Sequence, residues 1–589
     1  MRIGKNKPQR REILFFLLLF VFLSVLSIKM HHGRGTFNWK SEIYSDKAGY
    51  YMYLPATFFF HFDTKKVPQG LDEKTGYGFS VDRQKNVIST QYFYGVSLMV
   101  APFFFSAHLY SKIAGRYEQD GFSDTFQKFS DIAAVFYLIL GLFFLKKFLR
   151  HYFRESLQYF IILSTFLGTN LFYYAMDDGL MSHVYSFFTV ALFLFAMKEF
   201  LMDQTRYRYF LLMTIAFALM FIIRPTNCLV GFIFLFWDVS NRKEILSRIQ
   251  QILSPRYLFP LMAIMFLFIL PQLLYWKMAH GTLIYLKYGE KFIYWNHPKI
   301  LEVWFSTLNG LIPWSPLILL YIIGMIFMVT RKIKNGIPIL VMFLLISYMA
   351  ASYRYWYFGC CHGHRAFVEF YPLFCIPFGF LSDKIFTSAN MARKVFFAFL
   401  MLFMIYMNIG LTIFGDKCFF GSTWDWNQYS RVLERIYLYP ASARRFGFIN
   451  DFENSSLFSS SMVSDSIGNS GNWNAVLDKD HETCCEHTIW MWDFYGKIPK
   501  FITARISVKK VNHKPVHAFL VCSFWKDDIM ISQQTQQIDP FVRDSINWFI
   551  VYKTFMIPDR ITGDTRINVY VLNKERNKFF VDDLIIKEK

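Results

Sequence analysis

The feature that most limits how this chain can fold is a long series of apolar segments, each close to the length of a membrane-spanning helix, separated by short basic loops. The composition agrees, because 54% of the 589 residues are hydrophobic and 20% are aromatic. A water-soluble protein of this length needs far less apolar surface. The pattern therefore predicts a polytopic α-helical membrane protein.

The basic loops predict the orientation, because cytoplasmic loops of membrane proteins carry an excess of Lys and Arg. If the run at 93–110 crossed the membrane, the basic loop after 131–146 would face outward, so we expect 93–110 to be juxtamembrane or re-entrant. The N-terminus is then cytoplasmic. About eleven spans are predicted, near 13–29, 131–146, 158–175, 183–197, 208–223, 227–238, 257–276, 312–330, 337–352, 366–382 and 395–414.

The formal net charge of +20 bears on the partners. In a soluble protein it would suggest nucleic acid, but here much of the excess lies in loops between apolar runs. Membrane lipid and a phosphate-bearing substrate are therefore the expected partners, and nucleic acid is not. Eight cysteines are too few for a disulfide framework. The first apolar run is read as an uncleaved helix, since no small-x-small site follows it. We expect a multi-pass protein of the bacterial inner membrane.

The chemistry of the chain changes from about residue 451. Apolar and polar residues alternate from there, and turn residues separate the alternating stretches, which predicts an antiparallel β-sandwich. The predicted strands are 502–511, 516–525, 547–557, 567–573 and 579–587. The expected organisation is a transmembrane domain at 1–415, an interfacial linker at 416–450, and at 451–589 an extracytoplasmic sandwich that is a candidate carbohydrate-binding module.

Ionisable residues near membrane depth are costly and usually have a function. With the topology above, most of them fall on the outer side. Asp46, directly after the first helix and just before a cluster of tyrosines, is the leading candidate, although an acidic residue in an ordinary solvated loop would give the same pattern. The other candidates for the site are Lys47, Asp178, His183, Arg224, Lys287, Glu290, Lys291, His364, Arg365 and Glu369.

Several of these residues have more than one reading. Asp177 and Asp178 could bind a divalent metal together with Asp46, whereas Asp178 could equally cap the next helix. The forked donors of Arg365 suit a phosphate, and an anchor to lipid headgroups is the alternative. Lys291, with Lys287, could clamp a phosphate or anchor the loop at the interface.

The His-x-His of residues 362–364 invites a zinc site, but no third ligand is clear. His183 falls inside a predicted helix, where packing is at least as common a role as ligand binding. The paired cysteines at 360–361 and 484–485 are predicted to be free or bonded to other partners rather than catalytic. Beyond a divalent metal, no cofactor is predicted.

The chain resembles the C-type glycosyltransferase superfamily, membrane enzymes that use polyprenyl-phosphate-linked sugars and include protein O-mannosyltransferases and lipid A aminoarabinose transferases. The resemblance is architectural and covers about 1–415. It is carried by Asp46 after the first helix, the large outer loop 30–128, Ile223-Arg224-Pro225-Thr226, and Gly363-His364-Arg365 followed by Tyr371-Pro372. The usual second acid beside the first is missing, because Lys47 stands there and Glu42 is the nearest acid.

The resemblance implies a glycosyltransferase that moves a sugar, with inversion, from a polyprenyl-phosphate donor to a glycan, lipid or protein acceptor on the outer face. Asp46 would be the general base, and Arg365 with Lys287 or Lys291 would stabilise the departing phosphate. Two other classes stay open. A lipid-linked sugar flippase or transporter would place polar residues near the bilayer midplane. A non-catalytic cell-envelope assembly protein would bind through the sandwich.

Overall fold

The fold was analysed in a computed structural model, which describes residues 10–38, 40–115, 121–285, 291–414, 422–437, 447–450, 463–464, 469, 474–490, 499–512, 514–526, 528–543, 547–558, 561 and 565–588. The chain forms two compact units. The first comprises Met1–His32 and Thr36–Leu438, and the second comprises Gly33–Gly35 and Tyr439–Lys589. The candidates Lys287 and Glu290 lie outside the described residues.

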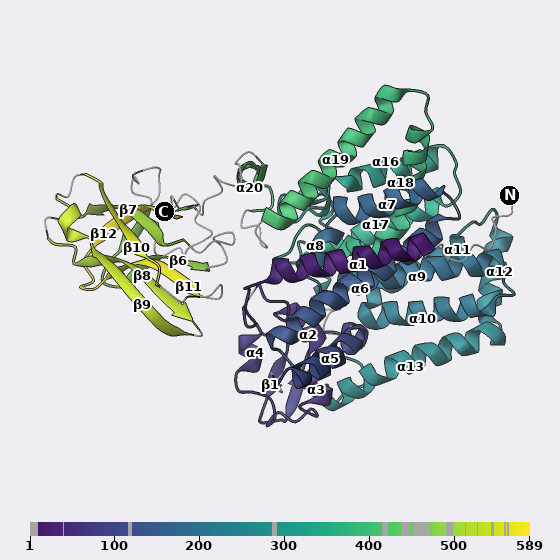
Figure 1. The fold of residues 1–589 in the computed structure, drawn as a ribbon, viewed down its shortest axis with the longest axis horizontal. Helices are drawn as coiled ribbons and strands as arrows, with labels where there is room; N and C mark the ends of the chain where they lie inside the picture. Colours follow the sequence, from purple (N-terminus) through teal and green to yellow (C-terminus); the bar gives the residue numbers. More distant parts are fainter. Residues whose placement is uncertain are drawn as a thin grey trace. The chain divides into compact units, whose positions relative to one another are not determined.

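The first unit is a bundle in which the long helices run alongside one another (Figure 1). Its helices are α1 (Arg10–His31), α2 (Asp46–Tyr51), α3 (Tyr53–Phe58), α4 (Leu71–Lys74), α5 (Gly95–Ile113), α6 (Asp124–Leu149), α7 (Glu155–Gly168), α8 (Leu171–Met176), α9 (Ser182–Met202), α10 (Tyr207–Ile223), η1 (Pro225–Phe232), α11 (Ile233–Phe236), α12 (Arg242–Leu253), α13 (Pro255–His280), α14 (Ile300–Phe305), α15 (Leu311–Trp314), α16 (Leu317–Thr330), α17 (Gly336–Ser352), η3 (Arg365–Phe370), α18 (Tyr371–Phe386), α19 (Met391–Phe414) and α20 (Trp426–Tyr437). A short antiparallel pair, β1 (Ser80–Asp82) and β2 (Val87–Ser89), lies between α4 and α5.

The predicted membrane class is confirmed by the helices of this unit. Within the described residues, seven helices are long and apolar enough to cross a bilayer: Arg10–His31, Gly95–Ile113, Asp124–Leu149, Ser182–Met202, Pro255–His280, Arg365–Phe386 and Met391–Ile413. Shorter apolar helices occupy Tyr207–Ile223, Pro225–Phe236, Leu317–Thr330 and Gly336–Ser352. Large apolar side chains stay exposed along α13 and α19, as expected of surfaces that face lipid.

Some predicted spans are interrupted. The segment 158–175 forms two helices, α7 and α8, which are separated at Thr169 and Asn170. The side chain of Asn408 donates to the carbonyls of Leu167 and Thr169, both at 2.8 Å, so the carbonyls left free at the break find a partner. The segment 312–330 is likewise divided before α16, at Pro316, which cannot donate a helical hydrogen bond.

The run that we expected to be juxtamembrane forms α5, which by length and composition could also span. Its ring contacts with α6 involve Phe126, Phe129, Phe136 and Tyr137, which lie between the start of that helix and its middle. Helix α5 therefore packs beside the N-terminal half of α6. The candidate residues lie at the same end of the bundle as the start of α6.

Charged side chains gather at the two ends of the bundle. At one end, Lys146 and Lys147 pair with Glu12 of α1, at 2.9 and 3.0 Å. Arg150 follows α6 and pairs there with Glu199, near the end of α9, at 2.6 Å. These residues come from segments that the sequence placed at the cytoplasmic side, so two of the predicted basic loops do lie together.

At the opposite end, α1 stops at His31, which contacts Asp131 near the start of α6 at 3.4 Å. Helices α1 and α6 are therefore antiparallel neighbours. Lys47 and Asp178 pair at this end at 2.6 Å. The candidate residues thus share one end of the bundle, as the predicted alternation requires. The side of the membrane to which that end belongs stays a prediction.

The second unit contains two antiparallel sheets around one apolar core, and this confirms the predicted all-antiparallel β class. The strands are β3 (Gly447–Asn450), β4 (Val463–Ser464), β5 (Asn474–Leu477), β6 (Thr483–Trp490), β7 (Phe501–Lys510), β8 (Ala518–Lys526), β9 (Ile529–Gln537), β10 (Phe549–Met556), β11 (Arg566–Asn573) and β12 (Phe579–Glu588). One sheet runs β10-β7-β12-β5-β4 with β3 beside β12, and the other runs β6-β11-β8-β9. Strand β9 was missed because most of its residues are exposed or half-buried and its second half is rich in Gln.

Candidate active site

Asp46 opens α2 in a turn that the surrounding backbone holds tightly. The preceding Ser45 has a φ of 51°, in the left-handed region. A Cβ on Gly78 would lie 1.8 Å from the carbonyl oxygen of Ser45, so only glycine fits there. The Asp46 side chain remains 34% exposed. The chain therefore presents this partly exposed carboxylate from a constrained turn.

Two side chains donate to the Asp46 carboxylate. The hydroxyl of Tyr92 donates to Oδ1 at 2.5 Å, and Nη2 of Arg365 donates to Oδ2 at 3.1 Å. The Arg365 side chain is 16% exposed and starts η3, directly after a glycine-containing loop. Gly363 in that loop has a φ of +62°, and a Cβ there would lie 2.8 Å from Trp314. Arginine and carboxylate thus meet from opposite parts of the chain, both with exposed surface.

Lys291 joins this group through a relay of hydrogen bonds. Its Nζ donates to Oε1 of Gln91 at 2.9 Å, and Nε2 of Gln91 donates to the Tyr92 hydroxyl at 3.1 Å. Since Tyr92 donates to Asp46, a second cation lies two side chains from the carboxylate. Lys287 and Lys291 are the lysines predicted to clamp a phosphate. Of these two, Lys291 is the one that lies within the described residues.

A buried network lies beside the first group. Glu369 is 1% exposed, accepts from Nη1 of Arg224 at 3.0 Å, and accepts from Nδ1 of His183 at 2.9 Å. Both partners are needed because an unpaired buried carboxylate is very costly. The Arg224 side chain is 18% exposed, so Glu369 and His183 hold a guanidinium that is partly accessible.

The two groups lie within electrostatic range of the same tyrosines. Burial raises the pKa of Tyr50, and the charges of Arg224, Asp46 and Arg365 act on it in addition. Burial also raises the pKa of Tyr353, on which the same three charges act. The carboxylate and both arginines therefore lie within electrostatic range of both Tyr50 and Tyr353.

Lys47 points away from Asp46 into another buried cluster. Its Nζ contacts Asp178 at 2.6 Å and Glu42 at 3.4 Å. Burial lowers the pKa of Lys47, but Asp178, Glu42 and Asp177 outweigh that effect and hold the pKa above its ordinary value. Lys47 therefore links α2 to the segments that carry Asp178 and Glu42 through ion pairs, and Asp178 is the nearer partner.

The two histidines of the His-x-His pattern lie in separate aromatic surroundings. His362 stacks on Tyr173, with ring centroids 4.8 Å apart, whereas His364 packs edge-on between Phe358 and Phe367. Both rings are nearly inaccessible, at 2% and 0% exposure. Among the described residues, no cluster of potential metal ligands contains either histidine. His364 shapes the loop before Arg365. Cys360 is disulfide-bonded, and Cys361, Cys484 and Cys485 are free.

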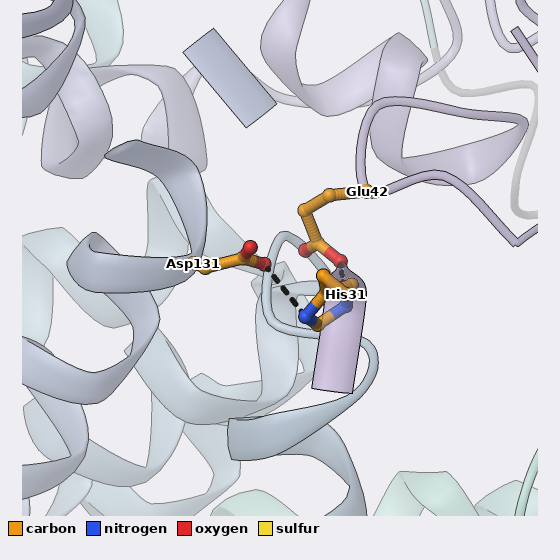
Figure 2. Close-up of side chains that lie close together, drawn as sticks. All are labelled: His31, Glu42 and Asp131. Atoms are coloured by element: carbon orange, nitrogen blue, oxygen red, sulfur yellow. Dashed lines mark ion pairs between the residues drawn. The ribbon is translucent and has the colours of Figure 1, made fainter. Parts of the chain in front are cut away.

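One cluster of side chains has the spacing of metal ligands, but it does not include Asp46, Asp177 or Asp178. Within the part of the chain that the structure describes, one group of three or more His, Cys, Asp or Glu side chains brings its ligand atoms within 4.8 Å of one another. It consists of His31, Glu42 and Asp131, which converge in Figure 2. The acids named from the sequence form no such group.

Sequence reasoning missed several of these residues. Tyr92 and Gln91 had no signal, because a tyrosine is one of 35 in the chain and its hydrogen bond to Asp46 depends on the fold. The sequence did contain a signal for Asp131, since an acidic residue at the start of an apolar run is costly unless it has a function. His31 gave no comparable signal, because it is one of 14 histidines and its neighbours depend on the fold.

A shallow apolar groove of about 310 Å³ lies between α19 and α20. Its lining includes Phe403, Tyr406, Met407, Leu433 and Tyr437. None of the candidate site residues lines it.

Comparisons with known proteins were made at the level of sequence and of structure. No family model matches the chain, and no curated protein sequence matches it significantly. Among solved structures, ArnT from Cupriavidus metallidurans bound to undecaprenyl phosphate is similar with a TM-score of 0.42 and 10% identity, over 68% of this chain and 71% of that chain. The Archaeoglobus fulgidus oligosaccharyltransferase in the apo form has a TM-score of 0.41 and 12% identity, over 73% and 59%.

The arabinosyltransferase EmbB from Mycobacterium smegmatis is similar with a TM-score of 0.34 and 9% identity, over 100% of this chain and 66% of that chain. This chain thus spans less than two thirds of the length of EmbB and of the oligosaccharyltransferase. At these scores the likeness is loose, and the function is argued from the site's own residues.

Proposed function

We propose that this protein is a membrane glycosyltransferase that moves a sugar from a polyprenyl-phosphate donor to an acceptor hydroxyl at the outer face of the membrane. The observation that carries the proposal is the contact between Asp46 and Arg365, a partly exposed carboxylate and guanidinium 3.1 Å apart at one end of a bundle of apolar helices. One group can take a proton and the other can bind a phosphate.

The proposed reaction is a single displacement with inversion. The acceptor oxygen bonds to the anomeric carbon as its proton passes to the Asp46 carboxylate. The bond from the anomeric carbon to the phosphate oxygen breaks, and the electron pair leaves with the polyprenyl phosphate. The cations Arg365, Arg224 and Lys291 lie where they can stabilise that charge. Tyr92 positions Asp46.

The contact between Asp46 and Arg365 belongs to the resting state in this proposal. In an inverting displacement the entering and leaving oxygens lie on opposite faces of the reacting carbon. The acid and base of inverting glycoside hydrolases stand roughly 6.5–9.5 Å apart for this reason. A base and a phosphate ligand 3.1 Å apart cannot both act at once. The donor phosphate therefore competes with Asp46 for Arg365 and, by drawing the guanidinium away, frees the carboxylate.

The variant Asp46→Asn tests the proposal by separating turnover from binding. Loss of a general base lowers turnover by roughly 10²–10⁴-fold. Because the competitor for Arg365 is removed, the donor should bind at least as tightly as in the wild type. The measurements are transfer from a polyprenyl-phosphate sugar in detergent and the affinity for polyprenyl phosphate alone.

The matched control is Asp124→Asn, which changes an exposed acid at the start of α6 that pairs only with the surface residue Lys128 in the described contacts. It should behave as the wild type does. Normal transfer by Asp46→Asn would remove Asp46 as the base. Loss of donor binding together with transfer would make it a binding residue. A wild type that binds the donor but transfers sugar to none of the acceptor classes would favour a transporter.

A further inference from the structure

We propose that helix α12 (Arg242–Leu253) lies in the surface of the lipid bilayer and binds anionic phospholipid headgroups. The helix lies at the end of the bundle opposite Asp46 (Figure 1). The segment that leads into it contains Asp238, which pairs with Lys198 at 2.5 Å. Lys198 adjoins Glu199, which belongs to the charged group already described at that end. The helix contributes no residue to the Asp46 site, so this surface is separate from the proposed reaction.

Helix α12 is well capped, although none of its 12 residues is buried. The side chain of Asn241 accepts from the backbone N–H of Glu244 at 3.1 Å, and the Glu244 carboxylate accepts from the backbone N–H of Ser240 at 3.0 Å. This arrangement is a variant of the capping box. Nη1 of Arg248 donates to the carbonyl of Phe234 at 2.7 Å and so fastens the helix to α11. Because a helix of this length is marginal in water, its apolar side needs a cover.

Three large apolar side chains of α12 form an exposed stripe. Leu246, Ile249 and Leu253 are 59%, 36% and 60% exposed, and their spacing of three and four residues places them on one face of the helix. Ile252, by contrast, packs against the core of the bundle. The exposed apolar side chains of α13, beginning with Phe259, follow directly along the chain. Since that face of α13 suits lipid, the same bilayer is the cover that suits the stripe.

The basic side chains around the stripe favour an anionic leaflet. Arg242 and Lys243 are exposed in the first turn of α12, where the helix macrodipole disfavours a cation. Arg208 and Arg256 are exposed in the first turns of α10 and α13, whose starts are joined by a hydrogen bond of 2.9 Å. The one acid in the sequence of α12, Glu244, is engaged in the cap. Negatively charged headgroups would offset the repulsion among these four cations and the helix ends.

The combination of an apolar stripe with basic side chains separates lipid from other occupants. Helices that lie in a membrane surface carry both features, with Lys and Arg at headgroup level and apolar side chains in the acyl region. Nucleic acid would match the charge but would leave the stripe exposed. A second copy of this chain could cover the stripe but would bring the same positive charge to the contact. An anionic lipid surface satisfies both features at once.

The test is hydrogen–deuterium exchange of the full chain in nanodiscs that hold one chain each. The amides of α12 should exchange more slowly in discs that contain phosphatidylglycerol than in discs of phosphatidylcholine alone. Arg242→Gln combined with Lys243→Gln should remove most of this difference, because two charges at about fivefold each amount to roughly 25-fold. The matched control is Lys65→Gln with Lys66→Gln, an adjacent exposed pair between α3 and α4, which should keep the difference.

Salt and the apolar stripe provide two further readouts. For the wild type, the difference between the two kinds of disc should shrink in about 1 M salt, where the Debye length is about 3 Å. Leu246→Gln with Leu253→Gln should speed exchange of α12 in both kinds of disc, while the amides of the β unit exchange as in the wild type.

Three outcomes would overturn the proposal. Equal exchange of wild-type α12 in both kinds of disc would remove the preference for anionic lipid. A full difference in the variant that lacks Arg242 and Lys243 would place the lipid contact elsewhere. Slow exchange that appears only in discs with two chains would make a second copy of this chain, rather than lipid, the cover of the stripe.

Discussion

At the scale of single residues, Asp46 and Arg365 are 319 positions apart in the chain and meet through one hydrogen bond. Their partial exposure matters, because water screens the pair and leaves its net contribution to stability small. A pair of this kind can open at little cost when a ligand offers Arg365 a better partner. The contact is therefore better suited to exchange than to holding the fold together.

The residue-scale prediction concerns Arg365. A charge-assisted hydrogen bond contributes about 1.5–3 kcal/mol, so Arg365→Ala should weaken donor binding or turnover by roughly ten- to a hundredfold. Arg365→Lys keeps the charge but loses the fork, and should recover part of the loss. The control is Arg354→Lys, an exposed arginine in the same stretch of chain. If both Arg365 variants match the wild type in affinity and turnover, Arg365 anchors the protein to lipid headgroups.

At the scale of elements, the stretch 353–364 connects α17 to η3 and delivers Arg365 to the site. Aromatic rings bury its two histidines. Burial lowers the pKa of His362 to about 4, against a smaller opposite effect of Asp177, and lowers the pKa of His364 to about 3. Both rings are therefore neutral when the stretch is packed at neutral pH.

A pH dependence follows from these depressed pKa values. As the pH falls from about 6.5 towards 4, the unpacked stretch binds protons that the packed stretch refuses, so the packed state loses stability. The Tm of the purified protein should fall over this range. In His362→Asn the Tm should fall less steeply over this pH range, because the imidazole that takes up the proton is absent. This holds whatever the Tm of the variant is at neutral pH. His297→Asn, at an exposed histidine outside the stretch, should keep the wild-type slope. Equal slopes in all three proteins would contradict the prediction.

At the scale of the whole first unit, charged residues are sorted to the two ends of the bundle. Glu12 lies with Lys146 at one end, and His31 lies with Asp131 at the other. This arrangement agrees with a single alternation of spans. The fold of the bundle is the same in either orientation, so the outward position of the Asp46 end stays a prediction.

Labelling of single cysteines would decide the orientation. Lys85→Cys, in the exposed turn between β1 and β2, should react with a membrane-impermeant maleimide in intact cells if that end is outside. Ala389→Cys, exposed between α18 and α19, should react only after the membrane is opened. The unaltered chain provides the background from its native cysteines. Reversed labelling would place Asp46 on the cytoplasmic side and remove the proposed outer-face reaction.

The local pattern of the sequence was sufficient for the membrane class and for much of the β unit. Apolar runs predicted α1, α6, α9 and α13, because transfer of a helix into lipid depends on its own side chains. Alternation predicted β7, β8, β10, β11 and β12, whose inward residues are buried in turn. Alternation did not predict strand β9, because apolar and polar residues do not alternate clearly along it.

The sequence by itself determined the partition of segments between lipid and water, and it singled out Asp46, Arg224 and Arg365, because a charge beside an apolar run is costly wherever the run folds. Only the tertiary structure decided which of these residues meet. It paired Asp46 with Arg365 and Tyr92, and it placed His31 between two carboxylates. The physical reason is that hydropathy and periodicity report on the few residues around each position. A contact over hundreds of positions depends on how whole helices pack.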